Sequence, residues 1–318
     1  METNARRRII AVGDLVWDVL VKPDTILLPG GDTTGKVVLA PGGSAANVAA
    51  WIARVGVPAG FIGSVGADVF GALIVEDLQR EGVELYVSHT AVHDTGVILV
   101  LIDRAGQRSM VTNQGADFHL MPEELSEEAL RACDHVHITA WSLFTDPPRA
   151  AALRAAQLAK AAGATVSFDP ASYQMIRQMG YDTFTRITAG LPIDILFPNR
   201  DEGEALTGER EPTAIAQRLC DRYPEAIVVL KLDRDGCYVV ADSHAQHYPT
   251  GDGPVIDATG AGDAFDAAFM ARYLRDRDVA AAARFANAIG SWVVARYGAR
   301  PPVDAQLEAI LANDGAAK

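Results

Sequence analysis

The stretch IDATGAGDAFDAAF, residues 256–269, places three small residues directly before an aspartate that opens an apolar helix. The first turn of a helix carries free backbone N–H groups and the positive end of the peptide dipole, and small residues let an anion reach them. Gly260, Ala261 and Gly262 therefore predict an anion cradle. Asp263 would repel that anion unless it takes up a proton during the chemistry. The structural alternative is that Asp263 caps the helix after a glycine-rich turn.

A second glycine-rich stretch, GGDTTGKV at residues 30–37, has the spacing of a phosphate-binding P-loop as far as Lys36. Val37 stands where a P-loop needs the Ser or Thr that binds Mg²⁺, and a strand is predicted to follow instead of a helix. We therefore expect this stretch to belong to strand structure and not to a nucleotide site.

The elements that must position the cradle alternate between strands and helices. Residues 44–56 and 68–82 have helical spacing, with Ser44 and Asp68 as the predicted N-caps. Continuous apolar runs such as ATVSFD, DILFP and AIVVLKL are typical of parallel strands that are covered on both faces. The sequence therefore predicts an α/β fold with a doubly wound, mainly parallel sheet and helices on both faces.

Two segments, about 15–41 and 95–114, interrupt this alternation with hairpin-like strands and Gly-rich or Asp-Arg-Ala-Gly turns. We interpret them as a small β lid on one edge of the main sheet. A chain of 318 residues can form one large α/β domain with such an appendage, so we expect a single domain over residues 1–318. Exposed lid strands usually need a partner, which predicts a homodimer that pairs lid to lid.

Composition excludes several classes of function. The net charge of −13 argues against a nucleic-acid or anionic-membrane partner. The apolar runs are shorter than a bilayer span, and the basic start lacks the apolar core of a signal peptide, so we expect a cytoplasmic protein. The three cysteines form no C-x-x-C pair and predict neither a disulfide framework nor a zinc site. His135 and His137 share one face of a predicted strand, which favours packing or hydrogen bonding over metal binding.

Two motifs, one near the start of the chain and one near its end, resemble the two signatures of the ribokinase-like, or phosphofructokinase B, family of carbohydrate kinases. They are PGGSAANVAAWIARVG in the first sixth of the chain and DATGAGDAFDAAF near its end. GSVGADVFG, FPNRDEGEALTG and ANAIGSWVVARYGA also resemble family blocks, so the resemblance covers nearly the whole length. It implies a ribokinase-like fold and ATP-dependent phosphorylation of a sugar hydroxyl.

The resemblance also implies roles for individual residues. Asp263 would be the catalytic base, while the amides of Gly260, Ala261 and Gly262 hold the charge that develops on the transferred phosphoryl group. Asn199 and Glu202 resemble an N-x-x-E motif that holds Mg²⁺ largely through water, although acids also suit a helix start. Asp257 would lie near a monovalent-cation site, such as one for K⁺, or serve only as a turn carboxylate.

Substrate and nucleotide contacts follow from the same resemblance. Residues implied on the sugar side are Asp18, Gly42, Gly43 and Asn47, with Asp14 as a second candidate that could equally be a strand-end turn residue. Residues implied on the nucleotide side are Lys231 and Gly236, which match a phosphate-contacting strand and turn, together with Thr259 and Asn287, the last of which could equally be a packing residue.

Departures from the family pattern bear on the substrate. Ser44 replaces the Lys that usually follows the two glycines in ribokinase-type members, which argues against ribose itself. Gln114 stands where sugar-acid kinases carry an Arg, so a carboxylated sugar would lack one cation unless Arg108 supplies it. Asp233 replaces a Gly in the phosphate-side turn.

The expected function is ATP- and Mg²⁺-dependent phosphorylation of a primary hydroxyl of a sugar or a sugar-like alcohol, without a covalent intermediate. One alternative is a nucleoside kinase of the same family. Another is a non-catalytic regulator that binds sugar or nucleotide on the same fold, against which the intact Asp263 and its cradle weigh.

Overall fold

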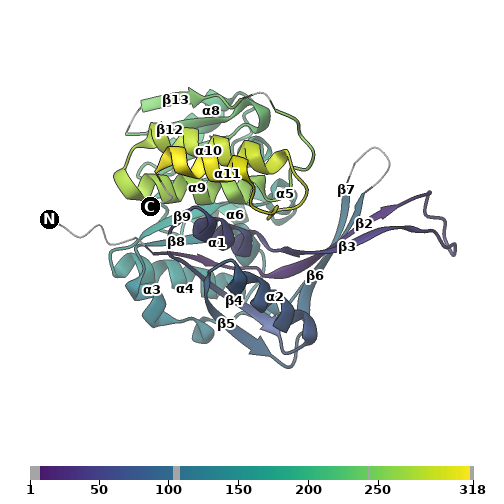
Figure 1. Ribbon diagram of the computed structural model, residues 1–318. Helices are drawn as coiled ribbons and strands as arrows, with labels where there is room; N and C mark the ends of the chain where they lie inside the picture. The colour runs from purple at the N-terminus through teal and green to yellow at the C-terminus, as the bar shows by residue number, and fades with distance from the viewer. Residues whose placement is uncertain (1–7, 103–107, 243, 252, 316–318) are drawn as a thin grey trace.

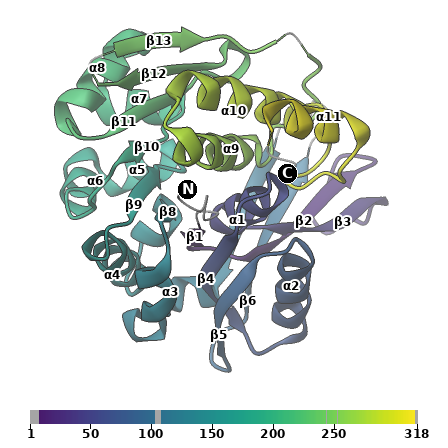
Figure 2. The ribbon, with the colours of Figure 1, turned by 60° about the vertical axis from the view of Figure 1, so that its left-hand side comes forward.

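The computed structural model describes residues 8–102, 108–242, 244–251 and 253–315. Within these residues a nine-stranded sheet forms the centre of the molecule (Figure 2), in the order β13-β12-β11-β10-β9-β8-β1-β4-β5. Its strands are β1 Ile9–Val12, β4 Ala59–Gly66, β5 Glu84–Thr90, β8 His135–Thr139, β9 Thr165–Asp169, β10 Ile195–Leu196, β11 Ile227–Lys231, β12 Cys237–Ala241 and β13 His244–Tyr248. All neighbours from β5 to β11 pair in parallel, while β12 and β13 are antiparallel.

Helices cover both faces of this sheet, as the alternating strands and helices predicted. They are α1 Ser44–Arg54, α2 Val69–Arg80, α3 Glu127–Ala132, α4 Pro148–Ala161, α5 Tyr173–Met179, α6 Tyr181–Thr188, α7 Arg200–Thr207, α8 Pro212–Arg222, α9 Ala261–Asp276, α10 Val279–Val294 and α11 Ala305–Asp314. The side chains of β1 alternate between the two faces: Ile9 and Ala11 pack with α1, α9 and α10, and Ile10 and Val12 pack with α3 and α4. The strand is therefore apolar throughout because both of its faces are buried.

Local signals account for the helix starts to different degrees. The side chain of Asp68 accepts a hydrogen bond from the N–H of Gly71 and caps α2, as predicted. The prediction that Ser44 caps α1 was wrong, because Gly43 is the N-cap and makes no side-chain bond. A carboxylate from a distant segment caps this helix instead: Asp14 accepts hydrogen bonds from the N–H groups of Ser44 and Ala45 at 2.9 and 3.0 Å.

A second sheet of four strands projects from one side of the molecule (Figure 1), in the order β3-β2-β6-β7. Its strands are β2 Val16–Pro23, β3 Gly35–Gly42, β6 Thr95–Ile102 and β7 Arg108–Gly115. The lysine of the P-loop-like stretch lies in β3, so a strand follows this stretch, as predicted. The predicted Asp-Arg-Ala-Gly turn falls at residues 103–106, outside the described part of the chain.

The chain order of the main sheet reverses beside β1. From β1 the sheet continues through β4 and β5 in one direction and through β8, β9, β10 and β11 in the other. In open α/β sheets the carboxyl ends of the strands at such a reversal form a crevice that receives ligands. The start of α1 and the start of α9 both approach this edge, and the two helices pack side by side (Figure 2).

Candidate active site

The anion cradle predicted from the sequence is the N-terminus of α9. Gly260 precedes the helix with a φ of 71°, a left-handed conformation that suits glycine. A Cβ atom at this position would lie 2.4 Å from the Cβ and 2.6 Å from the Cα of Ala299, so the turn also has no space for a side chain. The N–H of Ala261 donates to the carbonyl of Ala258 at 3.3 Å, and within the described residues no side chain caps the amides that follow it, which leaves these amides available to an anion.

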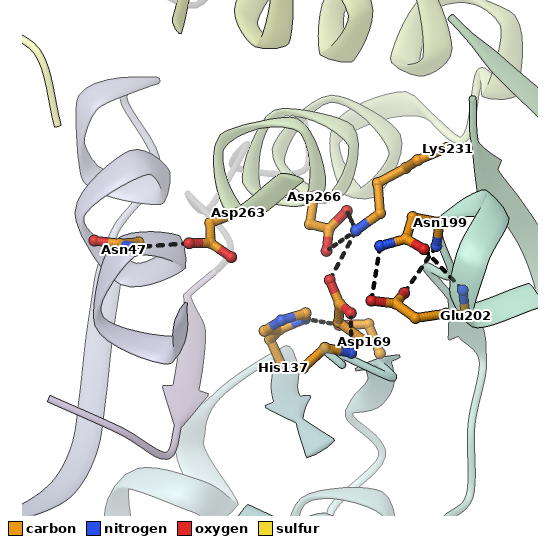
Figure 3. A network of polar contacts seen from close by, with 10 residues as sticks. Asn47, His137, Asp169, Asn199, Glu202, Lys231, Asp263 and Asp266 are labelled. Atoms are coloured by element: carbon orange, nitrogen blue, oxygen red, sulfur yellow. Dashed lines mark hydrogen bonds and ion pairs between the residues drawn. The ribbon is translucent and has the colours of Figure 1, made fainter. Parts of the chain in front are cut away.

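Asp263 lies in the first turn of α9, next to these amides. The amide nitrogen of Asn47, in α1, donates a 2.8 Å hydrogen bond to Oδ2 of Asp263 (Figure 3). Burial raises the pKa of Asp263 to about 7, against the opposing effect of this hydrogen bond. A carboxylate with a pKa near the working pH can accept a proton from a hydroxyl group, which is the chemistry predicted for Asp263.

Asn47 therefore bonds directly to the predicted base, whereas the sequence predicted only a contact of Asn47 with the sugar. Its side-chain oxygen accepts a 2.9 Å hydrogen bond from Nε of Arg300. The sequence carried no signal for Arg300, because it lies 253 residues away from Asn47 in the chain.

The two glycines before α1 are packed against the segment that follows β1. Gly43 has a φ of 93°, and a Cβ there would lie 2.4 Å from the carbonyl oxygen of Asp14. A Cβ at Gly42 would lie 2.7 Å from the carboxylate of Asp18, so only a glycine lets that carboxylate lie against the backbone. The sugar contact of Asp18 stays a prediction. Asp14 is 4% exposed and caps α1, which favours its structural alternative.

Lys231 ends β11 and forms a buried ionic cluster with two aspartates. Its Nζ lies 2.7 Å from Oδ2 of Asp169, at the end of β9, and 3.1 Å from both carboxylate oxygens of Asp266, in α9 (Figure 3). Burial acts to lower the pKa of Lys231, but the two carboxylates outweigh it and raise that pKa. The ammonium also lies 3.5 Å from the Cβ position of Gly262 and so borders the cradle. The predicted phosphate contact of Lys231 therefore belongs to a side chain that already contacts two carboxyl groups, of which Asp266 has a pKa raised by burial.

Sequence reasoning assigned no role to Asp169 or Asp266. A signal for Asp266 was present, because it lies three residues after Asp263 and so on the same side of α9. The signal for Asp169 was its place at the end of an apolar strand of a parallel sheet.

Asn199 and Glu202 are joined at the start of α7 in a capping box. Asn199 Oδ1 accepts a hydrogen bond from the N–H of Glu202 at 2.9 Å, and the carboxylate of Glu202 accepts from the N–H and the Nδ2 of Asn199, both at 2.8 Å. Glu202 is 2% exposed, and burial followed by the charge of Asp169 raises its pKa. The part of the chain that the structure describes contains no group of three His, Cys, Asp or Glu residues that could hold a metal directly. The oxygen donors of Asn199 and Glu202 are of the kind that Mg²⁺ prefers, and their Mg²⁺ role stays a prediction.

Asp257 and Thr259 form the turn that leads into the cradle. Oδ1 of Asp257 accepts hydrogen bonds from the N–H and the hydroxyl of Thr259 at 2.8 and 2.6 Å, and Oδ2 accepts from the N–H of Gly298 at 3.0 Å. This geometry matches the turn-carboxylate alternative, and the monovalent-cation role of Asp257 stays a prediction.

Gly236 and Asn287 both hold the segment that leaves β13. A Cβ at Gly236 would lie 2.2 Å from the carbonyl oxygen of Tyr248, and the amide of Asn287 donates to the same carbonyl at 2.8 Å. Their nucleotide contacts also stay predictions. The side chain of Arg108, predicted on the sugar side, lies outside the described part of the structure.

His137 lies beneath the ionic cluster (Figure 3), on β8. His135 and His137 both bond to the hydroxyl of Ser167, at 2.8 and 2.7 Å, which confirms the prediction of hydrogen bonding on one face of a strand. Burial lowers the pKa of His137 to about 4, so this imidazole is neutral at physiological pH.

These contacts bring an uncapped helix N-terminus, a carboxylate with a pKa near neutrality and a buried ammonium to one edge of the sheet. The amides and the ammonium suit a phosphate group, and the carboxylate suits a hydroxyl that loses its proton. None of the helices described is long and apolar enough to cross a membrane.

Comparison with known proteins agrees with this arrangement. The family model described as "pfkB family carbohydrate kinase" matches residues 6–306. An ATP-dependent ribose-1-phosphate kinase from Halopiger xanaduensis is 37% identical over 302 residues, which cover 94% of this chain and 96% of the relative. A fructokinase from Klebsiella pneumoniae is 31% identical, with 83% of each chain covered.

Among solved structures, an Arabidopsis thaliana ribokinase complexed with ribose and ATP superimposes with a TM-score of 0.81. It shares 26% sequence identity, and the match covers 96% of this chain and 98% of that one. The fold is therefore the ribokinase-like fold predicted from the two signatures. The chain belongs to the PfkB family and is a carbohydrate kinase.

Proposed function

We propose that this protein transfers the γ-phosphoryl group of ATP to a hydroxyl group of a sugar or sugar phosphate, with Asp263 as the general base. The observation that carries this proposal is the position of Asp263 in the first turn of α9, beside amides that no described side chain caps. The names of the two relatives, a ribose-1-phosphate kinase and a fructokinase, support the choice of acceptor class.

In this mechanism Asp263 accepts the proton of the substrate hydroxyl as its oxygen attacks the γ-phosphorus. The new O–P bond forms while the bond to the β,γ-bridging oxygen breaks, and its electron pair leaves with ADP. The amides of residues 260–262 donate to the oxygens of the transferred group, and the Lys231 ammonium adds positive potential from behind Gly262. Asp18 and the glycine floor hold the sugar.

Asn199 and Glu202 would hold Mg²⁺ through water, and the ion would neutralise charge on the phosphates. The capping box supports this role only indirectly, because it presents a buried carboxylate whose pKa is raised and whose ionised form a nearby cation would favour.

The lid carries the observation that supports a dimer. Leu39, Val19, Leu99 and Val111 form one cross-strand row by register, on the face opposite to Asp18. Leu39 and Val111 at the edges of this row are 54% and 65% exposed. A second copy of the chain would cover this apolar face. Sedimentation that shows only monomer at assay concentration would contradict the dimer.

The function is tested by ADP release with Mg-ATP against ribose 1-phosphate, ribose, fructose, a sugar acid and adenosine, for the wild type and Asp263→Asn. We expect turnover with a sugar or sugar phosphate and a loss of about 10²- to 10⁴-fold in the variant. Turnover with adenosine alone would favour the nucleoside alternative. Binding without turnover, or an unaffected variant, would favour a non-catalytic regulator.

A further inference from the structure

Arg300 is a buried arginine that lies directly behind the catalytic group. Its side chain is 2% exposed, its Nε donates to Oδ1 of Asn47 at 2.9 Å, and its Nη1 donates to Oδ2 of Asp77 at 3.0 Å. It thus joins α1, α2 and the segment before α11. Burial of an arginine that is nearly inaccessible to water has a large desolvation cost, so the interactions with its few partners have to offset that cost.

The direction of the hydrogen bonds gives Arg300 a specific effect on Asp263. A guanidinium has donors and no acceptor, so only the oxygen of the Asn47 amide can face it. The nitrogen of the same amide must then face Asp263, where it donates to Oδ2 at 2.8 Å. With the amide turned over, two acceptors would meet, and Asp263 would have to be protonated to make a hydrogen bond. The order Arg300 to Asn47 to Asp263 therefore favours the ionised carboxylate.

The loop that carries Arg300 is itself tied to the cradle. Nε1 of Trp51 donates to the carbonyl oxygen of Ala299 at 2.9 Å, and Ala299 packs against the side of Gly260 that lacks a Cβ. The guanidinium of Arg54 pairs with Glu81 at 2.6 Å and donates to the carbonyl of Pro301 at 2.8 Å. Arg300 is consequently held on both sides of its backbone and has a defined position.

We propose that Arg300 is a positioning residue that locks the amide of Asn47 in the orientation that donates to Asp263, and thereby keeps the base ionised and one of its oxygens directed to the substrate. This inference rests on the proposed function of Asp263.

Other charged groups also face Asp263. Asp169 on β9 and Asp14 after β1 favour the protonated carboxyl group, and Lys231 on β11 favours the carboxylate. Around Arg300 itself lie the charges of Asp77, Glu81 and Arg54. All of these remain in an Arg300 variant. Loss of the guanidinium removes both the lock on the amide and a positive charge near Asp263, and both changes raise the pKa of the base.

The test compares the pH dependence of kcat for the wild type, Arg300→Met, Arg300→Lys and Arg296→Met. In Arg300→Met we expect the acid limb of the kcat profile to move to higher pH by about one unit. At pH values on the acid side of the limb, kcat should then be about tenfold lower than in the wild type, and at pH values above the limb it should return to the wild-type value. Arg300→Lys retains a group with donors only, so the limb should return toward its wild-type position. Arg296 pairs with Asp304 on the same segment and makes no contact with Asn47, so Arg296→Met should leave the limb in place.

An Arg300→Met variant with an unchanged acid limb would overturn the inference about Arg300. The proposed function would still stand in that case if Asp263→Asn is inactive. A loss of kcat that is equal at all pH values would assign Arg300 a structural role only. If Arg300→Met does not fold, Arg300→Gln applies the same test, because a glutamine amide can accept as well as donate and does not force the orientation of Asn47.

A second readout does not depend on turnover. In protein labelled with ¹³C at the aspartate carboxyl carbons, the signal of Asp263 is identified by its absence in Asp263→Asn. Its titration should shift to higher pH in Arg300→Met by the same amount as the kinetic limb. An unshifted titration refutes the inference even if no substrate is turned over, and failure of the whole substrate panel refutes the proposed function instead.

Discussion

Replacement of Lys231 by methionine tests the buried ionic cluster. The side chains of Lys231, Asp169 and Asp266 are 12%, 10% and 0% exposed, and the ammonium is within 3.1 Å of both carboxylates. Removal of one partner from a buried pair leaves an uncompensated charge, which costs about 3–5 kcal/mol. We expect a loss of this size in the free energy of unfolding of Lys231→Met at pH 8, measured by urea denaturation.

The loss should depend on pH in a defined direction. In the wild type the pKa of Lys231 is raised by its partners. The contribution of Lys231 to the free energy of unfolding is therefore fully present when the pH is below the ordinary pKa of lysine, and it is lost only when the pH rises through the raised pKa of the folded state. Over pH 5–8 that contribution is therefore constant. In the wild type burial already raises the pKa of Asp266, whereas the pKa of Asp169 is lowered with Lys231 as a partner. In the variant the absence of the ammonium raises the pKa of both aspartates, so the folded variant binds more protons than its unfolded state. The stability of Lys231→Met should then fall as the pH rises from 5 to 8.

Lys160→Met is the matched control. Lys160 pairs with Asp194 at 2.6 Å, but its side chain is 41% exposed, and exposed pairs contribute about 0–1 kcal/mol. A loss for Lys231→Met that is no larger than that of Lys160→Met, or that is the same at pH 5 and pH 8, would refute the reasoning. The double variant Lys231→Met with Asp266→Asn should recover part of the loss, because it removes one of the two unpaired charges.

Three further predictions concern the cradle and its ligands. Because burial raises the pKa of Asp263 to about 7, and the base acts ionised, kcat should be half-maximal near pH 7 and fall about tenfold per unit below it, in a stopped assay of ADP release. Gly260→Ala should lower the free energy of unfolding by more than Gly163→Ala does. Both positions have a positive φ, but only a Cβ at residue 260 would overlap Ala299. Equal losses in the two variants would argue against the overlap. Glu202→Gln should raise the Mg²⁺ concentration needed for half-maximal activity, and an unchanged requirement would limit Glu202 to its capping role.

The features of the fold that the sequence predicted well are local ones. The apolar runs of the strands, the helical spacing after residues 43 and 68 and the glycine-rich turn before Asp263 each depend on a few neighbouring residues. The cap of α1 shows where this fails. Ser44 is a good N-cap by type, but it is the first residue of the helix and Gly43 is the N-cap. The carboxylate of Asp14, which lies 30 residues before Ser44 and is brought there by the end of β1, accepts from the N–H groups of Ser44 and Ala45.

The sequence by itself determined the class of fold and a glycine-rich helix start with a carboxylate in its first turn, because periodicity, glycine and a helix N-terminus act within one or two turns of chain. Tertiary structure alone decided which groups act on that carboxylate. Asn47 meets Asp263 across 216 residues and Arg300 meets Asn47 across 253, while Lys231 meets Asp169 across 62. The last of these contacts exists because parallel strands end at one edge of the sheet, and the first two exist because α1, α9 and the segment before α11 pack together on one face of it. A pattern of neighbouring residues contains no record of which strand ends or helices lie side by side.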